Sequence, residues 1–375
     1  MAAGSILPPS LHILGSGSIG TLFASSIRRA LPDYPVSILL RSGRGHEDSI
    51  ITRKRCLSGA HVEYSAIVSS VRYPNDKSSG FSVDIPAELI SPAGQTAANP
   101  TTTIQNLLVA TKAPDVRAAV SSVLHRLDRQ YGSNIIILSN GAMAVRDEIE
   151  RLLENERDGG SNVQSQLLNT KITLASTTHG AYRSTDGDEN GHSGHHSIVH
   201  AGIGSTFVES QSMANLFEAA GLRATYASPD EMNVLLWKKL ATNCAINPLT
   251  ALHKCANGKL AYINEEEIAA MDGVIEEVSQ IALMDAAGRG LSDESTKELK
   301  YESLSSFVKK VIRDTAGNKS SMLQDVIAGR KTEIHYLNGH VVRIGRENYG
   351  HECPFNEEMV KRVEGITCST TRQSR

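Results

Sequence analysis

The sequence predicts an α/β fold in which an N-terminal, doubly wound sheet is followed by an all-helical C-terminal domain. Over the first half of the chain, apolar runs typical of buried strands alternate with helical segments, the pattern of a parallel sheet. After Pro229 helical periodicity dominates and few strand signals remain. We therefore expect domains over 1–228 and 229–366, followed by a disordered polar tail over 367–375.

Each element follows from a local pattern. Apolar runs predict the strands Leu11–Leu14, Val36–Leu40, Asn106–Ala110, Ile135–Leu138, Ile172–Ala175, Ser197–Gly202 and Arg223–Tyr226. Helical spacing predicts a helix that includes Glu231–Leu240, followed by Asn264–Ala287, Ser295–Asp314, Ser321–Ala328, Glu333–Tyr349 and Asn356–Ile366. Two polar segments predict insertions into the first domain. Segment 69–103 is expected to be a peripheral loop with one short strand near Phe81–Ile85, and segment 183–197 an enlarged hairpin loop.

Composition limits the function classes. The 375 residues are 40% hydrophobic and 21% charged, with a net charge of -3, which argues against a nucleic-acid binder with a broad basic face. Apolar runs are too short to cross a bilayer, and Met1–Ser10 resembles neither a secretory signal nor an arginine-rich presequence. Five scattered cysteines without CxxC spacing indicate reduced thiols. We expect a cytoplasmic protein with a small-molecule partner, with a mitochondrial location left open.

A glycine-rich motif separates the first predicted strand from the first helix, and it reads Gly15-Ser16-Gly17-Ser18-Ile19-Gly20. In dinucleotide-binding folds the first glycine permits a tight turn, the second lets the backbone approach the pyrophosphate, and the third allows close helix–strand packing. The helix N-terminus adds free N–H donors. The flanking strand and helix patterns favour this Rossmann-like interpretation over a glycine-rich turn in an unrelated α/β protein.

The end of the second predicted strand indicates which dinucleotide is bound. NAD-binding sheets usually carry an Asp or Glu there, which accepts a hydrogen bond from the ribose 2′-OH. This chain has Arg41, followed by Ser42 and Arg44, and no carboxylate. Because a guanidinium suits a 2′-phosphate, the sequence predicts NADPH/NADP+. Arg44 is equally well interpreted as a solvated charge at the strand end.

A polar row on the first C-terminal helix is the strongest candidate for chemistry. Lys239, Asn243 and Asn247 recur every four residues, which places an amine and two amides in one line. Such a row on a largely buried helix must be paired, either inside the protein as an interdomain hydrogen-bond row or with a ligand. Lys239 is the natural acid for a carbonyl reduction, because an ammonium can stabilise and protonate the developing alkoxide. Lys238 points about 100° away from Lys239 around the helix axis, so it does not belong to this row.

Other polar residues have both structural and functional interpretations. Ser320 or Ser321 suits an N-cap, and Glu333 suits the start of the next helix. Lys112 and Asn140 follow predicted strands, at the sheet edge where doubly wound folds bind ligands. Asn140 with its following glycine also fits an ordinary turn.

The histidines do not predict a metal site. His192, His195, His196 and His200 lie largely in a polar loop that gives them no fixed geometry, so we expect no metal. His179 follows a predicted strand, and a satisfied structural histidine is favoured there over a cofactor-facing one.

Taken in order, these segments resemble the ketopantoate reductase family over Leu11 to about Ile366. The segments that carry the resemblance are GSGSIG at 15–20, Arg41, VATKA with Lys112, SNGAM with Asn140, TTHGA at 177–181, WKKLATNCAINPLTAL at 237–252 and SSMLQDVIAGRKTEI at 320–334. The last two blocks are the most specific.

The resemblance implies an NADPH-binding N-terminal domain, a helical C-terminal domain, and a role for each matched residue. By motif, Lys239 matches the general acid and Glu333 an active-site glutamate, while Asn243, Asn247, Asn257 and Ser321 match substrate-binding positions. On the cofactor side, Lys112, Asn140 and Ala181 join the glycine motif and Arg41. For Ser321 and Glu333, the resemblance alone favours a functional role over a role as a helix cap.

The implied reaction is NADPH-dependent reduction of 2-dehydropantoate to (R)-pantoate, in pantothenate and coenzyme A biosynthesis. His335 stands where family members often have Asp, and both insertions are longer than in compact bacterial members. Reduction of another 2-oxo acid and a non-catalytic regulatory role are therefore the alternatives. A homodimer through the C-terminal helical domain is a possible assembly.

Overall fold

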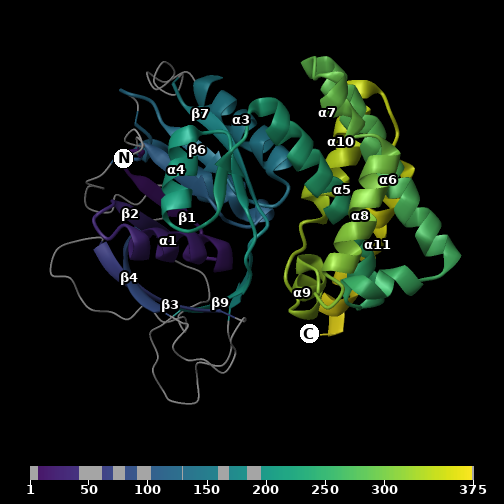
Figure 1. Ribbon diagram of the computed structural model, residues 1–375, viewed down its shortest axis with the longest axis horizontal. Helices are drawn as coiled ribbons and strands as arrows, with labels where there is room; N and C mark the ends of the chain where they lie inside the picture. Colours follow the sequence, from purple (N-terminus) through teal and green to yellow (C-terminus); the bar gives the residue numbers. More distant parts are fainter. Residues whose placement is uncertain are drawn as a thin grey trace. The chain divides into compact units, whose positions relative to one another are not determined.

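The computed structural model describes residues 7–41, 61–70, 81–90, 103–128, 130–158, 169–183 and 196–373. The chain divides into two compact units, Met1–Ala227 and Ser228–Arg375 (Figure 1). The first contains the sheet and the second is helical, so the predicted fold class is confirmed.

The N-terminal unit is built around one twisted sheet (Figure 1). Its strands are β1 (Leu11–Leu14), β2 (Val36–Arg41), β3 (His61–Ser70), β4 (Phe81–Ile90), β5 (Asn106–Val109), β6 (Asn134–Ile137), β7 (Lys171–Thr177), β8 (Gly180–Arg183), β9 (His196–Gly202), β10 (Thr206–Val208) and β11 (Ala224–Tyr226). They lie in the order β11-β10-β7-β6-β5-β1-β2-β4-β3-β9-β8.

The middle of this sheet is parallel and doubly wound. Strands β4, β2, β1, β5, β6 and β7 all pair in parallel, in the order typical of dinucleotide-binding folds. The direction of winding reverses between β1 and β5, and ligands bind beyond the carboxyl ends of the strands at such a switch point. Antiparallel pairs of β3 with β4, β7 with β10 and β8 with β9 make the sheet mixed.

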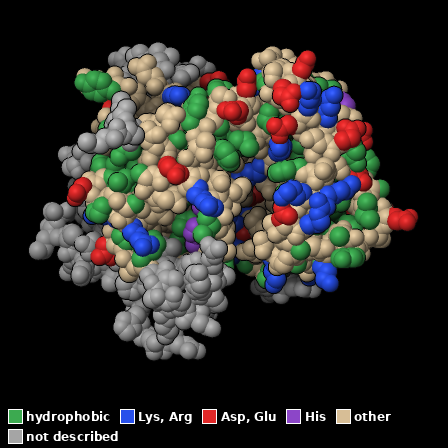
Figure 2. Space-filling view, in the orientation of Figure 1, with side chains coloured by type: hydrophobic (Ala, Val, Ile, Leu, Met, Phe, Trp, Pro, Cys, Tyr) green, Lys and Arg blue, Asp and Glu red, His purple; other side chains and the backbone are tan. Residues whose placement is uncertain are grey.

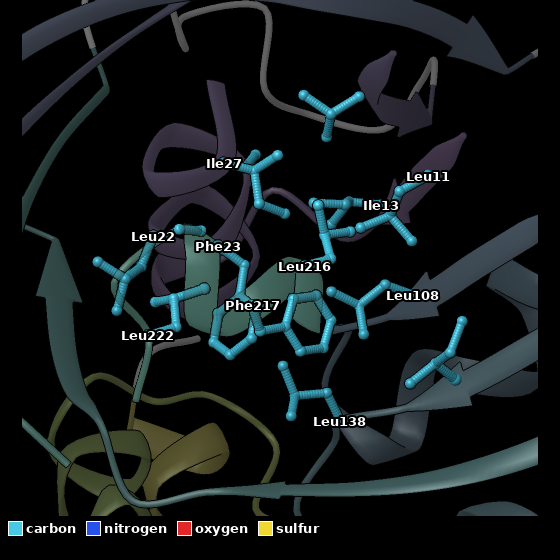
Figure 3. Packing of buried hydrophobic residues seen from close by; sticks show 14 of the residues in the cluster. Leu11, Ile13, Leu22, Phe23, Ile27, Leu108, Leu138, Leu216, Phe217 and Leu222 are labelled. Carbon is cyan, nitrogen blue, oxygen red and sulfur yellow. The ribbon is translucent and has the colours of Figure 1, made fainter. Parts of the chain in front are cut away.

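Two helix pairs cover the sheet. Helices α1 (Ser18–Ala30) and α4 (Gln211–Ala219) pack together, and the short α2 (Val116–Ser121) packs against α3 (Ala142–Asp158). Right-handed crossovers place the two pairs on opposite faces. In Figure 3, Phe23 of α1 meets Phe217 of α4 among leucines and isoleucines from the sheet, with ring centroids 5.1 Å apart and ring planes at 85°. This edge-to-face contact anchors the helix that follows the glycine motif.

Segment 69–103 differs from the peripheral loop that the sequence predicts. Within it, β4 runs from Phe81 to Ile90 and lies between β2 and β3 in the body of the sheet. Pro86 interrupts the pattern in the sequence, yet its position pairs with Glu63 of β3, a strand that the sequence analysis did not predict. The apolar alternation in this segment is weak, but the segment forms a strand because β2 and β3 supply its hydrogen-bond partners. The remaining residues of this segment, 71–80 and 91–102, lie outside the described residues.

Segment 183–197 follows a hairpin pairing. Strands β8 and β9 are antiparallel neighbours, with Arg183 opposite Ile198. The loop residues 184–195, including His192 and His195, lie outside the described residues.

The C-terminal unit is a helical assembly around α5. Its elements are α5 (Pro229–His253), the 3-10 turn η4 (Asn257–Tyr262), α6 (Glu265–Arg289), α7 (Asp293–Lys297), α8 (Tyr301–Asp314), α9 (Ser321–Ile327), the 3-10 turn η5 (Ile334–Tyr336), α10 (Asn338–Tyr349) and α11 (Pro354–Gln373). Helix α5 starts with a capping box between Ser228 and Glu231 and packs against α6, α8, α9 and α11. Figure 2 shows Lys and Arg side chains gathered over α8, where Lys309 and Lys310 pair with Asp272 and Asp314.

A proline inside α5 is accommodated by a buried amide. Pro248 has no N–H to donate to the carbonyl of Cys244, four residues earlier. Asn338 of α10 donates to that carbonyl at 3.1 Å and to the Asn356 side chain at 3.0 Å. Asn356 in turn donates to the buried carboxylate of Glu277 on α6 at 2.8 Å. This network fixes α5 against α10, α11 and α6.

The last helix is longer than the sequence predicts. Helix α11 continues past Ile366 to Gln373, where a disordered tail was expected from residue 367. Thr367 bonds back to the carbonyl of Val363 at 3.3 Å, so a polar residue continues the helix here. Over the described ranges, none of the helices has the length and apolar character to cross a membrane.

Candidate active site

The glycine motif forms a close turn between β1 and α1. Gly15 has φ +117°, and a Cβ there would lie 2.8 Å from the backbone of Ala110 and Thr111. A Cβ on Gly20 would meet the carbonyl of Gly15 at 2.0 Å, whereas one on Gly17 would have open space around it. Close packing thus requires the first and third glycines, and the second leaves the backbone accessible to a ligand.

The start of α1 suits an anion. The N-cap Gly17 offers no side-chain cap, and the first turn contains no acidic residue. The first N–H groups of the helix therefore remain available, at the positive end of its dipole. Residues Ser16 to Gly20 fit the diphosphate of a dinucleotide on these grounds.

The end of β5 lies directly against this turn. Thr111 contributes a buried hydroxyl oxygen that has no hydrogen-bond partner within the described part of the chain. Its carbonyl accepts from Ser139 at 2.8 Å, which ties the ends of β5 and β6 together. Lys112 and Asn140 follow these two strands, as predicted from the sequence. The sequence analysis did not single out Thr111, although its place beside Lys112 after a central strand was a usable signal.

The remaining predicted cofactor residues come from different strands of the same sheet. Arg41 is the last residue of β2, opposite Ile90 of β4, and its side chain is not described. Ser42 and Arg44 lie outside the described residues. Ala181 lies on β8, half-buried against the core that contains α1.

The polar row of α5 combines one charged group with two unpaired amides. Lys239, Asn243 and Asn247 all lie on this helix, and Asn247 is only 7% exposed. Within the C-terminal unit, the structure records no hydrogen bond from the side-chain amide of Asn243 or of Asn247 over the described residues. Buried amides require hydrogen-bond partners. A polar ligand would supply them.

Lys239 has a strongly perturbed acidity. The residue is partly accessible overall, but burial of its ammonium lowers the pKa from 10.5 to about 8, while the negative charge of Glu333 acts in the opposite direction. Glu333 itself is 7% exposed and precedes η5. Its side chain makes no cap hydrogen bond, so the helix-start interpretation does not account for it.

The two serines before α9 have different roles. Ser320 is the N-cap, accepting from the backbone N–H of Leu323 at 3.1 Å and from the Thr250 hydroxyl of α5 at 2.7 Å. Ser321, the residue that the family motif matches, is exposed and not used as a cap. The cap thereby fixes the start of α9 against α5 and leaves the Ser321 hydroxyl available.

Asn257 lies at the start of η4. Its amide nitrogen donates to the Thr315 hydroxyl at 2.9 Å, while its buried oxygen has no partner among the described residues. A Cβ on the neighbouring Gly258 would meet Ala316 at 2.6 Å, so this glycine is required for the close approach of η4 to the chain after α8. Lys239, Asn243, Asn247, Asn257, Ser321 and Glu333 all belong to the C-terminal unit.

The histidines that the sequence analysis considered and whose side chains the structure describes make structural contacts. His179 Nε2 lies 2.9 Å from the carbonyl of Leu222, and Nδ1 accepts from the N–H of Gly204 at 3.1 Å and contacts His200 Nε2 at 2.9 Å. Burial and the neighbouring His179 lower the pKa of His200. His335 is exposed and pairs with Glu364 at 3.1 Å. Within the described ranges, we find no His, Cys, Asp or Glu cluster suited to a metal ion.

Comparison with known proteins identifies relatives of both units. The family model for ketopantoate reductase PanE/ApbA matches residues 11–211, and the model for its C-terminal domain matches 231–367. The 2-dehydropantoate 2-reductase of Vibrio cholerae serotype O1 is 32% identical over 278 residues, which cover 71% of this chain and 79% of that protein.

Solved structures share the fold at lower identity. A PanE/ApbA family ketopantoate reductase from Ralstonia eutropha JMP134 has a TM-score of 0.65 and 20% identity, over 96% of this chain and 99% of that one. A ternary structure of D-mandelate dehydrogenase with NADH and anilino(oxo)acetate has a TM-score of 0.67 and 18% identity, with the same coverage. Because the family models match most of the length of both units, this chain belongs to the ketopantoate reductase family of oxidoreductases.

Proposed function

We propose that this protein uses NADPH to reduce 2-dehydropantoate to (R)-pantoate, a reaction of pantothenate and coenzyme A biosynthesis, with Lys239 as the general acid. The observation that carries the proposal is the lysine itself, whose pKa of about 8 is matched to proton transfer near neutral pH. It lies on a helix whose neighbouring amides, Asn243 and Asn247, have no partner in the described chain. The bacterial relative named above carries the same substrate in its name.

The reaction requires a hydride at the carbonyl carbon and a proton at the carbonyl oxygen. When NADPH is bound, the nicotinamide ring supplies the hydride. The Lys239 ammonium stabilises the negative charge that develops on the oxygen and then donates its proton, so that the ketone becomes an alcohol. Lys239 is left neutral and regains a proton from solvent, and the charge of Glu333 favours that step because it raises the pKa of the lysine.

We assign substrate binding to the polar groups of the C-terminal unit that have no recorded partner. The amides of Asn243 and Asn247 can donate to the carboxylate and carbonyl groups of a hydroxylated 2-oxo acid, and the oxygen of Asn257 can accept from its hydroxyl group. The exposed Ser321 hydroxyl adds a further donor.

The preference for NADPH rests on the end of β2. Arg41 stands where NAD-dependent folds place a carboxylate. Arg41→Asp should therefore reverse the ratio of the NADPH and NADH dissociation constants, because the carboxylate repels the 2′-phosphate and accepts from a 2′-OH. An unchanged ratio would show that Arg41 does not select the cofactor.

The reaction is tested by measuring the oxidation of NADPH by the full chain from its absorbance. The substrates are 2-dehydropantoate and a panel of other 2-oxo acids. Lys239→Ala should lower kcat by about 10²- to 10⁴-fold with dinucleotide binding retained. Lys238→Ala is the matched control, because that lysine pairs with Glu298 and lies 4.7 Å from the Phe307 ring centroid.

Three outcomes distinguish the alternatives. A higher kcat/KM with another 2-oxo acid would keep the mechanism and change the substrate. Folded protein that binds NADPH but reduces no member of the panel would favour a regulatory role. Full activity in Lys239→Ala would contradict the assignment of the acid.

A further inference from the structure

Arg183 joins a distant strand to the glycine motif. It is the last residue of β8, and its Nη2 atom donates to the carbonyl oxygen of Ser16 at 2.9 Å. Strands β8 and β9 both lie against α1, so this contact belongs to the N-terminal unit alone. The end of β8 is thereby held beside the loop that fits a diphosphate.

The contact uses only part of the guanidinium. Arginine carries five N–H donors, and the structure records one hydrogen bond for Arg183, within the ranges described. The side chain is exposed and makes no ion pair with a carboxylate there. The carbonyl of Ser16 would keep a hydrogen bond without Arg183, because it also accepts from the Thr21 hydroxyl at 3.3 Å. A positive charge with spare donors therefore stands at the loop.

The loop itself lacks a cation. Residues 15–20 contain neither Lys nor Arg, so the donors at the start of α1 are backbone N–H groups and uncharged hydroxyl groups. A dinucleotide diphosphate carries two negative charges, for which forked guanidinium donors are well suited. Arg183 also shares a face of β8 with Ala181, two residues earlier, which the family motif matches to a cofactor-side position.

We propose that Arg183 is a further cofactor-binding residue, which donates to the diphosphate of the bound dinucleotide while it holds the Ser16 carbonyl. This inference rests on the proposed use of a nicotinamide dinucleotide. Arg183 would bind the diphosphate, which NADPH and NADH share, whereas Arg41 is proposed to bind the 2′-phosphate, which only NADPH carries. Loss of Arg183 should therefore weaken the binding of both dinucleotides, and loss of Arg41 that of NADPH alone.

The experiment is a binding titration without substrate. Arg183→Ala should raise the dissociation constants of NADPH and NADH by about tenfold each, as the loss of a charge-assisted hydrogen bond. The affinity for 2′-AMP, which has no diphosphate, should not change. Arg183→Lys should recover part of the loss, because the positive charge remains. The thermal midpoint of the free protein should stay at the wild-type value.

Arg28→Ala is the matched control. Arg28 is a partly exposed arginine in the last turn of the same helix, α1, and it likewise donates to a backbone carbonyl, that of Pro32. Its removal should leave both dinucleotide affinities unchanged.

The failure of this inference is distinct from the failure of the proposed function. Unchanged NADPH and NADH affinities in Arg183→Ala would overturn the role of Arg183 and leave the reductase assignment intact. An equal loss for 2′-AMP would show a general disturbance of the loop and would also overturn it. A wild-type protein that binds neither dinucleotide would overturn both proposals.

Discussion

Lys239 and Glu333 form the charged pair on which the proposed chemistry depends. Burial makes the lysine a stronger acid, and the carboxylate limits that change, so the pKa settles at about 8. A lysine with this pKa is mostly protonated at neutral pH and is still able to release its proton. The activity should therefore decline as the pH rises through about 8, because the ammonium form is lost.

Glu333→Gln tests this balance. The substitution removes the one influence that raises the pKa of Lys239 and leaves the burial that lowers it, so the alkaline decline of kcat should move to lower pH. The measurement is the pH profile of kcat between neutral and alkaline pH. Glu364→Gln is the control, since that exposed carboxylate pairs with His335 on the surface. An alkaline decline that stays in place or moves upward would contradict the pairing.

At the scale of elements, α5 presents the polar row and depends on its neighbours for its shape. Pro248 breaks the hydrogen-bond ladder one residue after Asn247, and Asn338 repairs the break from α10. The same amide continues through Asn356 to Glu277, so one buried network links the row to the N-terminus of α11. The backbone that carries Asn247 is thus set by residues far from it in the sequence.

Asn338→Leu should destabilise the C-terminal unit by about 2 to 4 kcal/mol, because it removes the donor that pairs with the Cys244 carbonyl and with the side-chain oxygen of Asn356. Urea unfolding followed by the fluorescence of Trp237, the one tryptophan in the sequence, reports on this unit. Asn348→Leu on the exposed side of α10 should change stability little. Equal stability of the two variants would show that the repair is dispensable.

The sequence predicted the parts of the fold that local patterns determine. The glycine turn, the strands β1, β2, β5 and β6 and the long helix with Lys239 all follow from spacing. The first half of strand β4 was predicted near Phe81–Ile85, but its continuation to Ile90 and its place inside the sheet depend on pairing with β2 and β3, which is not local information. For the same reason the sequence did not show which of Ser320 and Ser321 is the N-cap of α9. The Ser320 hydroxyl is held in place by Thr250, which lies on another helix.

At the scale of the whole molecule, the two units rest on different buried networks. The N-terminal unit contains a buried ion cluster, in which Arg126 contacts Glu88 of β4 at 2.6 Å and His12 of β1 lies 3.5 Å from the same carboxylate. Burial alone would raise the pKa of Glu88, but the His12 hydrogen bond and the Arg126 charge lower it from 4.5 to about 2. The ionised carboxylate therefore links β4, β1 and the 3-10 turn η3 (Leu124–Arg126).

This cluster predicts a loss of stability in acid. Because the folded pKa of Glu88 is depressed, its contribution is complete above the unfolded value near 4.5 and is lost as the pH falls toward about 2. The contribution at neutral pH is about 3 kcal/mol. Unfolding free energies from circular dichroism at several pH values measure it.

Glu88→Gln should remove this part of the acid dependence. It should also weaken the fold at neutral pH by about 3 to 5 kcal/mol, because the buried Arg126 loses the opposite charge of Glu88. Glu154→Gln, on the exposed face of α3, is the control. A Glu88→Gln variant that keeps the wild-type acid sensitivity would show that other groups carry it.

The pairing of β3 with β9 has a consequence for biosynthesis. Residues 66–70 of β3 find their parallel partners only at 196–200, and β8 joins the sheet through β9. A nascent chain can therefore form the glycine turn early, but the strand that carries Ala181 and Arg183 has no place in the sheet until the ribosome has released residue 202. With Arg183 in its proposed role, the dinucleotide site is completed only when most of the N-terminal unit has been made, and a cofactor would be recruited after that point.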